Sequence, residues 1–432
     1  MSPSRRQFLG ATGATAAALG LAACGGDDSS GSKATTAKGS VSTAKGALPD
    51  PKDAPFDTVV VLVMENRSFD HFLGWMPGTE GRQAGLSFPD KAGTMQETWK
   101  LAPDWQGCDM QDPFHFWQAM DSNYNAGAMD GWLKMNPDKF SIGYYEKDSL
   151  PVLASMAEGY TLYDHYFAAM LGPTWPNYIY QLCATTDIDY TGTYPEPGQP
   201  RPVNLQTAIF DRMKDAGLTS GYYHFGEPIT GLFASQRYDS ISHPIDKFFD
   251  DAKAGKLPNL VFVSPDYTAH AEFNGTSNDF HPYGSIQVAQ EFVAKVHDSL
   301  AESPQWKRMV FVMNFDEGGG FFDHVVPPAV ADDTVLPGEG PFPNLKMLGF
   351  RVPAIVMGPF APQRVVNDGP YEHCSVLKMV EWRWGLKPMT VRDANAKNLA
   401  ANLDFSTTRE ALTLPKFTAA PAVECVNPNH VG

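Results

Sequence analysis

Two pairs of oxygen-bearing side chains stand directly after short apolar runs of this 432-residue chain. Glu65 and Asn66 follow the run TVVVLVM, and Asp316 and Glu317 follow the run MVFVMNF. Neighbouring carboxylates are costly to bury unless a cation accompanies them. Carboxylate and amide oxygens are also the ligands that hard divalent cations prefer. The sequence therefore predicts one divalent metal ion between these groups, and it does not identify the metal.

A hydroxyl that fits this chemistry occurs in the segment LGPTWPN. Gly172 and Pro173 signal a turn, and Pro176 suits the first turn of a following helix. Thr174 therefore falls at or near a helix N-cap, where free N–H groups favour an anion. Taken alone, it would be a plain capping threonine. A nearby cation would lower the pKa of its hydroxyl, so beside the predicted metal we interpret Thr174 as a nucleophile.

Three histidines supply the remaining chemistry: His115, His281 and His373. Such groups can stabilise the oxygens of a phosphoryl group or protonate a leaving group. His115 lies in the aromatic segment DMQDPFHFW, where a packed, hydrogen-bonded structural histidine is the alternative. Together with a metal and a hydroxyl, these residues predict phosphoryl transfer through a covalent intermediate.

The elements that must position these groups are strands with helices between them. Four apolar runs are typical of strands buried on both faces, as in a parallel sheet. Apolar residues spaced three to four apart over 286–300 predict a helix packed on that sheet. In such α/β folds, ligands bind beyond the carboxyl ends of the strands. We therefore expect Asp266, which follows the second run, to join the metal-binding groups. The four runs are 58–64, 259–263, 309–315 and 352–357.

The N-terminus predicts an exported lipoprotein. SRRQFL at 4–9 matches the twin-arginine export pattern, and LAAC at 21–24 resembles a bacterial lipobox with Cys24 as the acylated thiol. An ordinary signal peptide, with Cys24 incidental, is the alternative. We expect residues 1–23 to be the signal and 24–50 a flexible tether. The protein would then be exported by the twin-arginine route to the cell surface or periplasmic side, with a lipid anchor holding it to the membrane.

The composition of the chain limits the kinds of molecule that it is expected to bind. The formal net charge of −16 disfavours a nucleic-acid partner. No apolar run after the signal approaches the roughly 20 residues of a membrane-spanning helix. Cys108, Cys183, Cys374 and Cys425 remain after the signal, and an oxidising compartment permits disulfides, but the sequence leaves their pairing open. It also leaves the oligomeric state open.

Five motifs of the chain carry a resemblance to a known family. The motifs are MENRSFDHFLG, GPTWPN, NDFHP, SPQWKRMVFVMNFDEGGGFFDHVVPP and EHCSVLKMVEWRWGL. They resemble the phosphoesterase family that holds bacterial and plant phospholipases C and a group of acid phosphatases, and the match runs from about residue 56 to about 386. The resemblance implies an alkaline-phosphatase-like, three-layer α/β/α sandwich with a mostly parallel central sheet. We assign 51–400 to this catalytic domain and 401–432 to a C-terminal tail.

The resemblance also implies roles for individual residues. Asp70, Asp323 and His324 lie in the same motifs, and we interpret them as residues that fix loops through hydrogen bonds. The implied site residues are Glu65, Asn66, Asp316 and Glu317 for the metal, Thr174 for the nucleophile, His115 and His281 for the phosphate pocket, His373 for catalysis, and Asp279 and Asn177 for substrate binding.

The chain departs from the family pattern at four positions around the expected pocket. They are Tyr178, Phe280, Ser285 and Gly318, where the family usually has arginine, an acid, aspartate and histidine. The metal set and the nucleophile are intact, so we expect catalysis.

The leading hypothesis is a phospholipase C that hydrolyses glycerophospholipids to diacylglycerol and a phosphorylated headgroup. An acid phosphatase acting on monoesters is the alternative within enzymes. A non-catalytic surface-binding lipoprotein is a third hypothesis, of a different class.

Overall fold

The computed structural model describes most of the chain after the expected tether. The predicted signal peptide 1–23, the predicted lipid anchor Cys24 and residues 25–47 lie outside the described residues. Within the described part, no helix is long and apolar enough to cross a membrane. The described residues are 48–187, 206–226, 228–233, 236–336 and 343–425.

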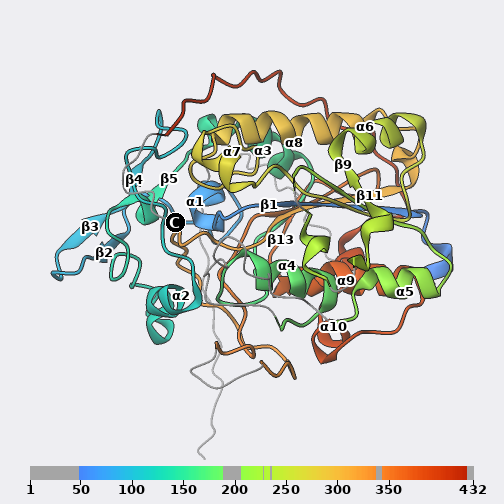
Figure 1. The fold of residues 1–432 in the computed structure, drawn as a ribbon, viewed down its shortest axis with the longest axis horizontal. Coiled ribbons are helices and arrows are strands. Elements are labelled where there is room, and N and C mark those ends of the chain that lie inside the picture. The colour runs from blue at the N-terminus through green and yellow to red at the C-terminus, as the bar shows by residue number, and fades with distance from the viewer. Residues whose placement is uncertain (1–47, 188–205, 227, 234–235, 337–342, 426–432) are drawn as a thin grey trace, which may run out of the picture. The chain divides into compact units, whose positions relative to one another are not determined.

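An eight-stranded sheet forms the centre of the fold (Figure 1). All its strands run in one direction except β12, which is antiparallel to both of its neighbours. In spatial order the strands are β13 (Arg364–Val366), β6 (Thr161–Tyr163), β12 (Ala354–Met357), β11 (Met309–Phe315), β1 (Thr58–Met64), β10 (Leu260–Val263), β8 (Ser220–His224) and β9 (Ser242–Pro244).

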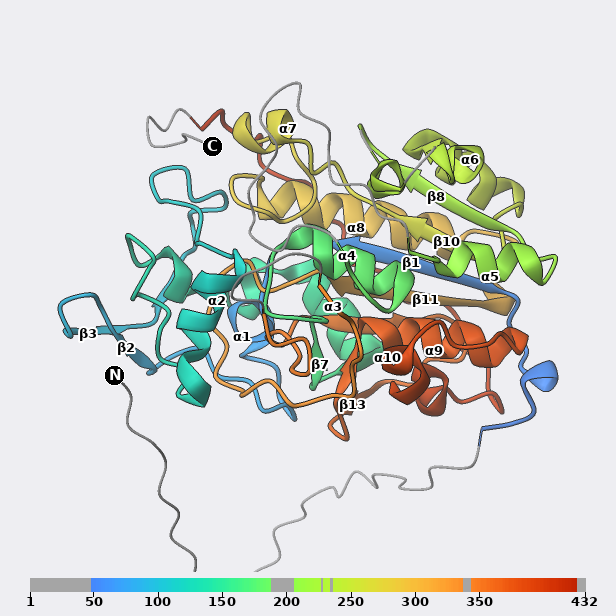
Figure 2. The same ribbon diagram turned by 60° about the horizontal axis from the view of Figure 1, so that its bottom comes forward.

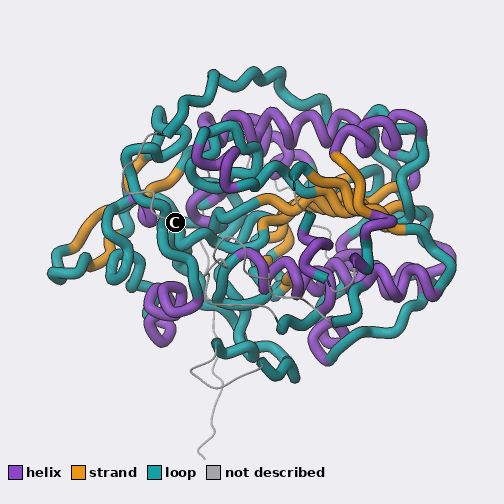
Figure 3. The backbone as a smooth tube through the Cα atoms, viewed as in Figure 1, coloured by secondary structure: helices purple, strands orange, loops and turns teal. Residues whose placement is uncertain are grey.

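Helices cover both faces of this sheet, which confirms the predicted three-layer α/β/α architecture. Figures 1 and 2 show two groups of helices with the strands between them, and Figure 3 shows the same layers as purple helices around orange strands. One layer contains α3 (Pro151–Gly159), α6 (Ile245–Ala254) and α8 (Ile286–Ala301). The other contains α4 (Thr174–Cys183), α5 (Ile209–Asp215), α9 (His373–Trp384) and α10 (Val391–Asn395).

Shorter elements gather beyond the carboxyl end of β1, on the left of Figure 1. They belong to the loops that follow the strands. These elements are α1 (Phe69–Leu73), α2 (Trp117–Tyr124), β2 (Ser87–Pro89), β3 (Met95–Glu97), β4 (Trp99–Lys100) and β5 (Gly143–Tyr144). Elsewhere lie α7 (Ala269–Phe273) and a small sheet of β7 (Tyr166–Phe167) and β14 (Tyr371–Glu372).

The predicted strands agree with the structure where the apolar runs are longest. Runs 58–64 and 309–315 form β1 and β11 residue for residue, and all their residues are buried. This burial explains the nearly continuous apolar sequence, because a central parallel strand is covered by helices on both faces. Run 352–357 forms β12 only from residue 354 onward, and its reversed direction was not evident from the run.

Within the expected tail, residues 403–425 pack back on the body, and we call them the C-terminal strap. Near its start, the backbone N–H of Asp404 donates to the carbonyl of Phe360 at 2.8 Å. At its end, Cys425 forms a disulfide with Cys108. This disulfide settles one pairing that the sequence left open, and the strap is therefore attached at both ends.

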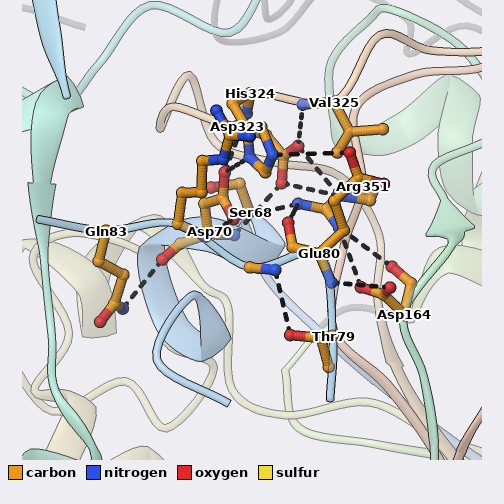
Figure 4. Close-up of polar contacts among 12 residues, drawn as sticks. Ser68, Asp70, Thr79, Glu80, Gln83, Asp164, Asp323, His324, Val325 and Arg351 are labelled. Atoms are coloured by element: carbon orange, nitrogen blue, oxygen red, sulfur yellow. Dashed lines mark hydrogen bonds and ion pairs between the residues drawn. The ribbon is translucent and has the colours of Figure 1, made fainter. Parts of the chain in front are cut away.

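A fully buried arginine joins three of the loops that flank the strands (Figure 4). Arg351 forms ion pairs at 3.0 Å with Asp70, Asp164 and Asp323. Asp70 lies in α1 and Asp323 follows β11, so this cation connects the segments that follow the two central strands. His324 Nδ1 lies 2.5 Å from Asp70 Oδ2. The interpretation of Asp70, Asp323 and His324 as residues that fix loops is confirmed, and Asp164, which it did not include, has the same role.

We predict that Arg351→Ala lowers the free energy of unfolding by about 3–5 kcal/mol, because it leaves three buried carboxylates without their cation. Arg351→Lys should recover part of the loss, since a lysine keeps the charge but not the fork of donors. Denaturant unfolding measures both.

A suitable control is Arg308→Ala, which removes an exposed ion pair with Asp57. It should cost about 0–1 kcal/mol. A loss for Arg351→Ala no larger than that of this control would contradict the assigned role.

Candidate active site

The register between β1 and β11 brings the two predicted pairs of ligands together. Met64 pairs with Phe315, so the residues that follow each strand emerge side by side. The backbone N–H of Asn66 donates to Asp316 Oδ1 at 2.9 Å. Glu65, Asn66, Asp316 and Glu317 are all at most 2% exposed. Three carboxylates and one amide therefore meet in a fully buried position at the carboxyl end of the sheet.

Thr174 reaches the same place from the opposite side, as the first residue of α4. Its hydroxyl donates to Glu65 Oε2 at 3.2 Å and lies 3.4 Å from Asn66 Oδ1. Its position at the helix start agrees with the prediction. The structure therefore places a hydroxyl against the oxygen cluster.

Asn177 supports the turn that presents Thr174. Its amide nitrogen donates to the carbonyls of Gly172 and Pro173 at 2.9 and 3.0 Å, and its oxygen accepts from the N–H of Met170 at 3.1 Å. The side chain is fully buried and bonded to the chain's own backbone. The structure thus gives it a positioning role, and its predicted contact with substrate stays a prediction.

Three ionised carboxylates in this buried cluster would repel one another. Burial first, and the neighbouring Asp316 carboxylate next, raise the pKa values of Glu65 and Glu317 well above their ordinary value. Burial raises the pKa of Asp316 to about 6. Among the described residues, no lysine or arginine forms an ion pair with these three carboxylates. The site lacks a protein cation that would balance its charge.

Two details show that these residues fit a divalent cation. Glu65 Oε1 is buried without a hydrogen-bond partner. The Asn66 amide reaches into the same cluster: one of its two terminal atoms lies 3.2 Å from both Asp316 oxygens and 2.7 Å from Glu317 Oε1, and the other lies 2.8 Å from His281 Nε2. With its nitrogen toward the carboxylates the amide donates hydrogen bonds to them, whereas a cation among these oxygens would instead bind the amide oxygen. An all-oxygen set of this kind suits a hard divalent metal.

Gly319 allows the two ligand-bearing loops to approach each other. It has φ +61°, and a Cβ at this position would collide with the carbonyl oxygen of Asn66. Asn66 itself has φ 59°, so both loops turn sharply at their closest point. Gly319 N–H also donates to Glu317 Oε2 at 2.6 Å. By contrast, a Cβ on Gly318 would meet its nearest neighbour, Ser68 Cβ, at 3.5 Å.

The two predicted phosphate-pocket histidines lie next to each other. The ring centroids of His115 and His281 are 5.5 Å apart. His115 Nδ1 donates to the Pro113 carbonyl at 2.9 Å, and His281 Nδ1 contacts the Pro282 carbonyl. A carbonyl only accepts, so each Nδ1 carries the proton, while His281 Nε2 lies 2.8 Å from the Asn66 side-chain amide. Burial lowers the pKa of both imidazoles.

Two acids beside these histidines were missed by the sequence analysis. Asp112 Oδ2 lies 3.6 Å from His281 Nε2, and Glu272 Oε2 lies 3.7 Å from His281 Nδ1. Burial raises the pKa of Asp112 to about 8 and that of Glu272 well above its ordinary value. Asp112 stands three residues before His115 and had this positional signal. Glu272 had none, because the segment that forms α7 was expected to be a polar loop.

The remaining predicted residues lie around the cluster. His373 is buried, and its Nε2 donates to the backbone carbonyl of Asp316 at 2.6 Å, so it helps to position a predicted metal ligand. Asp279 Oδ1 accepts from Ser277 and from the N–H of His281. Its Oδ2 is buried without a partner. The catalytic role of His373 and the substrate contact of Asp279 stay predictions.

The strand-end argument also predicted that Asp266 joins this cluster, and the structure shows its side chain hydrogen-bonded to a neighbouring residue. Its carboxylate accepts hydrogen bonds from the N–H and the hydroxyl of Thr268, at 3.1 and 2.8 Å, at the start of α7. Its side chain therefore stabilises a local turn.

The comparison with known families decides the affiliation of this site. The model of the Phosphoesterase family matches residues 56–387. This chain belongs to the phosphoesterase family. It is accordingly a hydrolase that acts on phosphoric ester bonds. The predicted resemblance, which ended at about residue 386, is confirmed.

Curated relatives of this phosphoesterase come from plants and bacteria. It is 32% identical to "Non-specific phospholipase C1" of Arabidopsis thaliana over 383 residues, 80% of this chain and 70% of the relative. It is 27% identical to "Phospholipase C B" of Mycobacterium tuberculosis, over 90% of this chain and 87% of the relative. Among solved structures, it resembles a protein in the alkaline phosphatase superfamily from Vibrio parahaemolyticus, with 12% identity, a TM-score of 0.38 and coverage of 80% and 71% of the two chains.

We predict that Gly319→Ala weakens divalent metal binding by about tenfold or more, since the added methyl pushes the Asn66 loop away from Asp316. The matched control is Gly318→Ala, because a methyl group there meets only ordinary van der Waals contacts. Calorimetric titration of the metal-stripped, folded variants gives the dissociation constants. Equal affinities in the two variants would show that the close approach does not hold the ligands.

Proposed function

We propose that this phosphoesterase is a metal-dependent phospholipase C, which cleaves glycerophospholipids through a phosphothreonine intermediate at Thr174. The observation that carries the proposal is the Thr174 hydroxyl, placed 3.2 Å from Glu65 Oε2 within a buried, all-oxygen cluster. The phospholipase C names of the curated relatives support the substrate class.

In the first step, Thr174 Oγ1 forms a bond to phosphorus while the bond between phosphorus and the glycerol oxygen breaks. The hydroxyl proton leaves toward Glu65 Oε2, its partner in the resting site. When bound, a divalent cation would lower the pKa of this hydroxyl and neutralise charge on the phosphate. In the second step, water attacks phosphorus, and the Thr174 oxygen leaves and regains its proton.

The imidazoles of His115 and His281 serve the phosphate in this proposal. Each Nδ1 is held by a backbone carbonyl, which fixes both rings, and a phosphate that binds His281 Nε2 would replace its contact with the Asn66 amide. An arriving phosphate anion would raise the lowered pKa of these rings and favour the imidazolium. They could then bind the phosphoryl oxygens and give a proton to the leaving glycerol oxygen.

We predict that Thr174→Ala abolishes release of phosphocholine from phosphatidylcholine, with a loss of about 10³-fold or more in kcat. Thr174→Ser, which keeps a hydroxyl, is the matched control and should retain most of the activity. Acid quenching of the parent during turnover should leave a phosphorylated peptide that contains Thr174.

The same experiment separates the alternatives. p-Nitrophenyl phosphorylcholine and p-nitrophenyl phosphate are assayed beside phosphatidylcholine, all with added divalent metal. Cleavage of the monoester alone would identify a phosphatase. No cleavage of any ester by the parent chain would refute the catalytic proposal and favour a binding protein.

We also propose export by the twin-arginine route and anchoring to a membrane surface through Cys24, supported by the SRRQFL and LAAC segments. Cys24→Ser should move the protein from the membrane fraction to the soluble fraction, because it removes the acylated thiol. Replacing both Arg5 and Arg6 by lysine is expected to retain the protein inside the cell. Membrane association unchanged by Cys24→Ser would contradict the anchor.

A further inference from the structure

The two predicted phosphate-pocket histidines lie on loops and not on strands of the central sheet. His115 lies on the loop between β4 and α2, and His281 lies on the loop between α7 and α8. Their relative position therefore depends on contacts between loops. The C-terminal strap supplies such contacts at its end.

One buried amide binds three segments at once. Gln106 Nε2 donates to the carbonyls of Val423 and Tyr283 at 2.9 and 3.2 Å, and its Oε1 accepts from the N–H of Val423 at 3.0 Å. Gln106 belongs to the loop of His115, Tyr283 follows His281, and Val423 belongs to the strap. The side chain is 7% exposed, so these bonds are shielded from water.

Further links reinforce the same junction. The disulfide joins Cys108, two residues after Gln106, to Cys425, two residues after Val423. It therefore attaches the end of the strap beside the Gln106 hydrogen bonds. The N–H of Asp112 donates to the hydroxyl of Tyr283 at 2.7 Å, so the histidine loops also contact each other directly. We call Gln106, Cys108, Tyr283 and residues 423–425 the C-terminal clamp.

The strap crosses the helices on one face of the sheet before it reaches the clamp. Figure 1 shows the strap as a dark red coil above α8, and Figure 2 shows its end beside α7. On the way, the N–H of Ala420 donates to Gln287 Oε1 at 2.8 Å. Gly275, just after α7, leaves room for the junction, because a Cβ there would collide with Gln106 and with the Val423 carbonyl.

The metal ligands are positioned by other means. Glu65 and Asp316 stand at the ends of β1 and β11, and their arrangement follows from the register of the central sheet. Loosening the strap should therefore disturb the histidine pair and leave the metal site in place.

We propose that the C-terminal clamp is a redox-sensitive positioning device for His115 and His281, an inference that rests on the proposed function of that pair. With the disulfide formed, the strap holds the loops of His115 and His281 in a fixed position relative to each other. Reduction by a dithiol adds two electrons and two protons, breaks the bond between the two sulfurs and frees the strap end. Oxidation by a disulfide-bearing thiol oxidant outside the cytoplasm reverses this step and raises phosphoester hydrolysis.

The test uses the full chain with its metal, before and after reduction with dithiothreitol. Reduction should lower kcat/KM for p-nitrophenyl phosphorylcholine by about 10- to 100-fold, because the histidines lose their alignment. Oxidised glutathione should restore it. Cys425→Ser should have the low activity from the start and show no response to dithiothreitol. Cys183 and Cys374 are buried thiols in the structure, so reduction leaves them unchanged.

A control variant loosens the strap away from the clamp. Arg409 Nη1 donates to the carbonyls of Ala361 and Gly159 at 2.8 and 3.2 Å. Arg409→Ala should keep the activity and its response to dithiothreitol. Circular dichroism and calorimetric metal titration follow the fold and the metal site, and both should be unchanged by reduction.

Three outcomes would overturn the proposal. Activity unaffected by reduction would show that the clamp positions nothing needed for turnover. Loss of fold and of metal binding along with activity would make the disulfide a general stabiliser. If the oxidised parent cleaves no phosphate ester, the proposed function is refuted, and the clamp proposal needs a readout other than activity. That readout is the imidazole NMR signals of His115 and His281, and signals unchanged by reduction would refute the clamp proposal.

Discussion

Burial of three carboxylates at one edge of the sheet is the constraint on which the rest of the site depends. Removing charged groups from water costs several kcal/mol each unless opposite charge accompanies them. The protein supplies no lysine or arginine ion pair to Glu65, Asp316 or Glu317 within its described part. Protons or a metal must therefore balance the charge, which is why burial raises the pKa of Asp316 to about 6. A divalent cation competes with those protons for the same oxygens, so the cost of burial becomes selectivity for a cation.

The surrounding structure keeps these acids from moving apart. Repulsion between carboxylates would open the site if the loops were free. Gly319 fixes the closest approach of the two loops, and Arg351 holds the segments that follow β1 and β11 to one another. Asn177 does the same for the turn that carries Thr174. Gly319 acts because it has no Cβ, Arg351 acts through ion pairs with acids, and Asn177 acts through hydrogen bonds to the backbone.

The sequence predicted the part of the site that the sheet determines. Glu65 and Asp316 follow apolar runs, and adjacent parallel strands deliver the residues after them to one edge. The same argument could not show that the Asp266 side chain bonds to Thr268, because a strand end fixes where the backbone emerges and not where the side chain points. It also could not give the direction of β12, since an apolar run reads alike in both directions. Glu272 was missed, and the partner of Cys108 was left open, because only contacts between segments distant in the sequence bring them into place.

The two halves of the site therefore differ in what stabilises them. The predicted metal-binding half depends on the register of two strands that are buried on both faces and tolerate little movement. The predicted phosphate-binding half depends on His115 and His281, whose loops are held by hydrogen bonds through Gln106 and Tyr283 and by a disulfide. Local opening costs less in loops of this kind than in a central sheet. A change in the surroundings will thus reach the histidines before it reaches the metal ligands. This order allows substrate handling to be adjusted while the costly arrangement of buried acids stays intact.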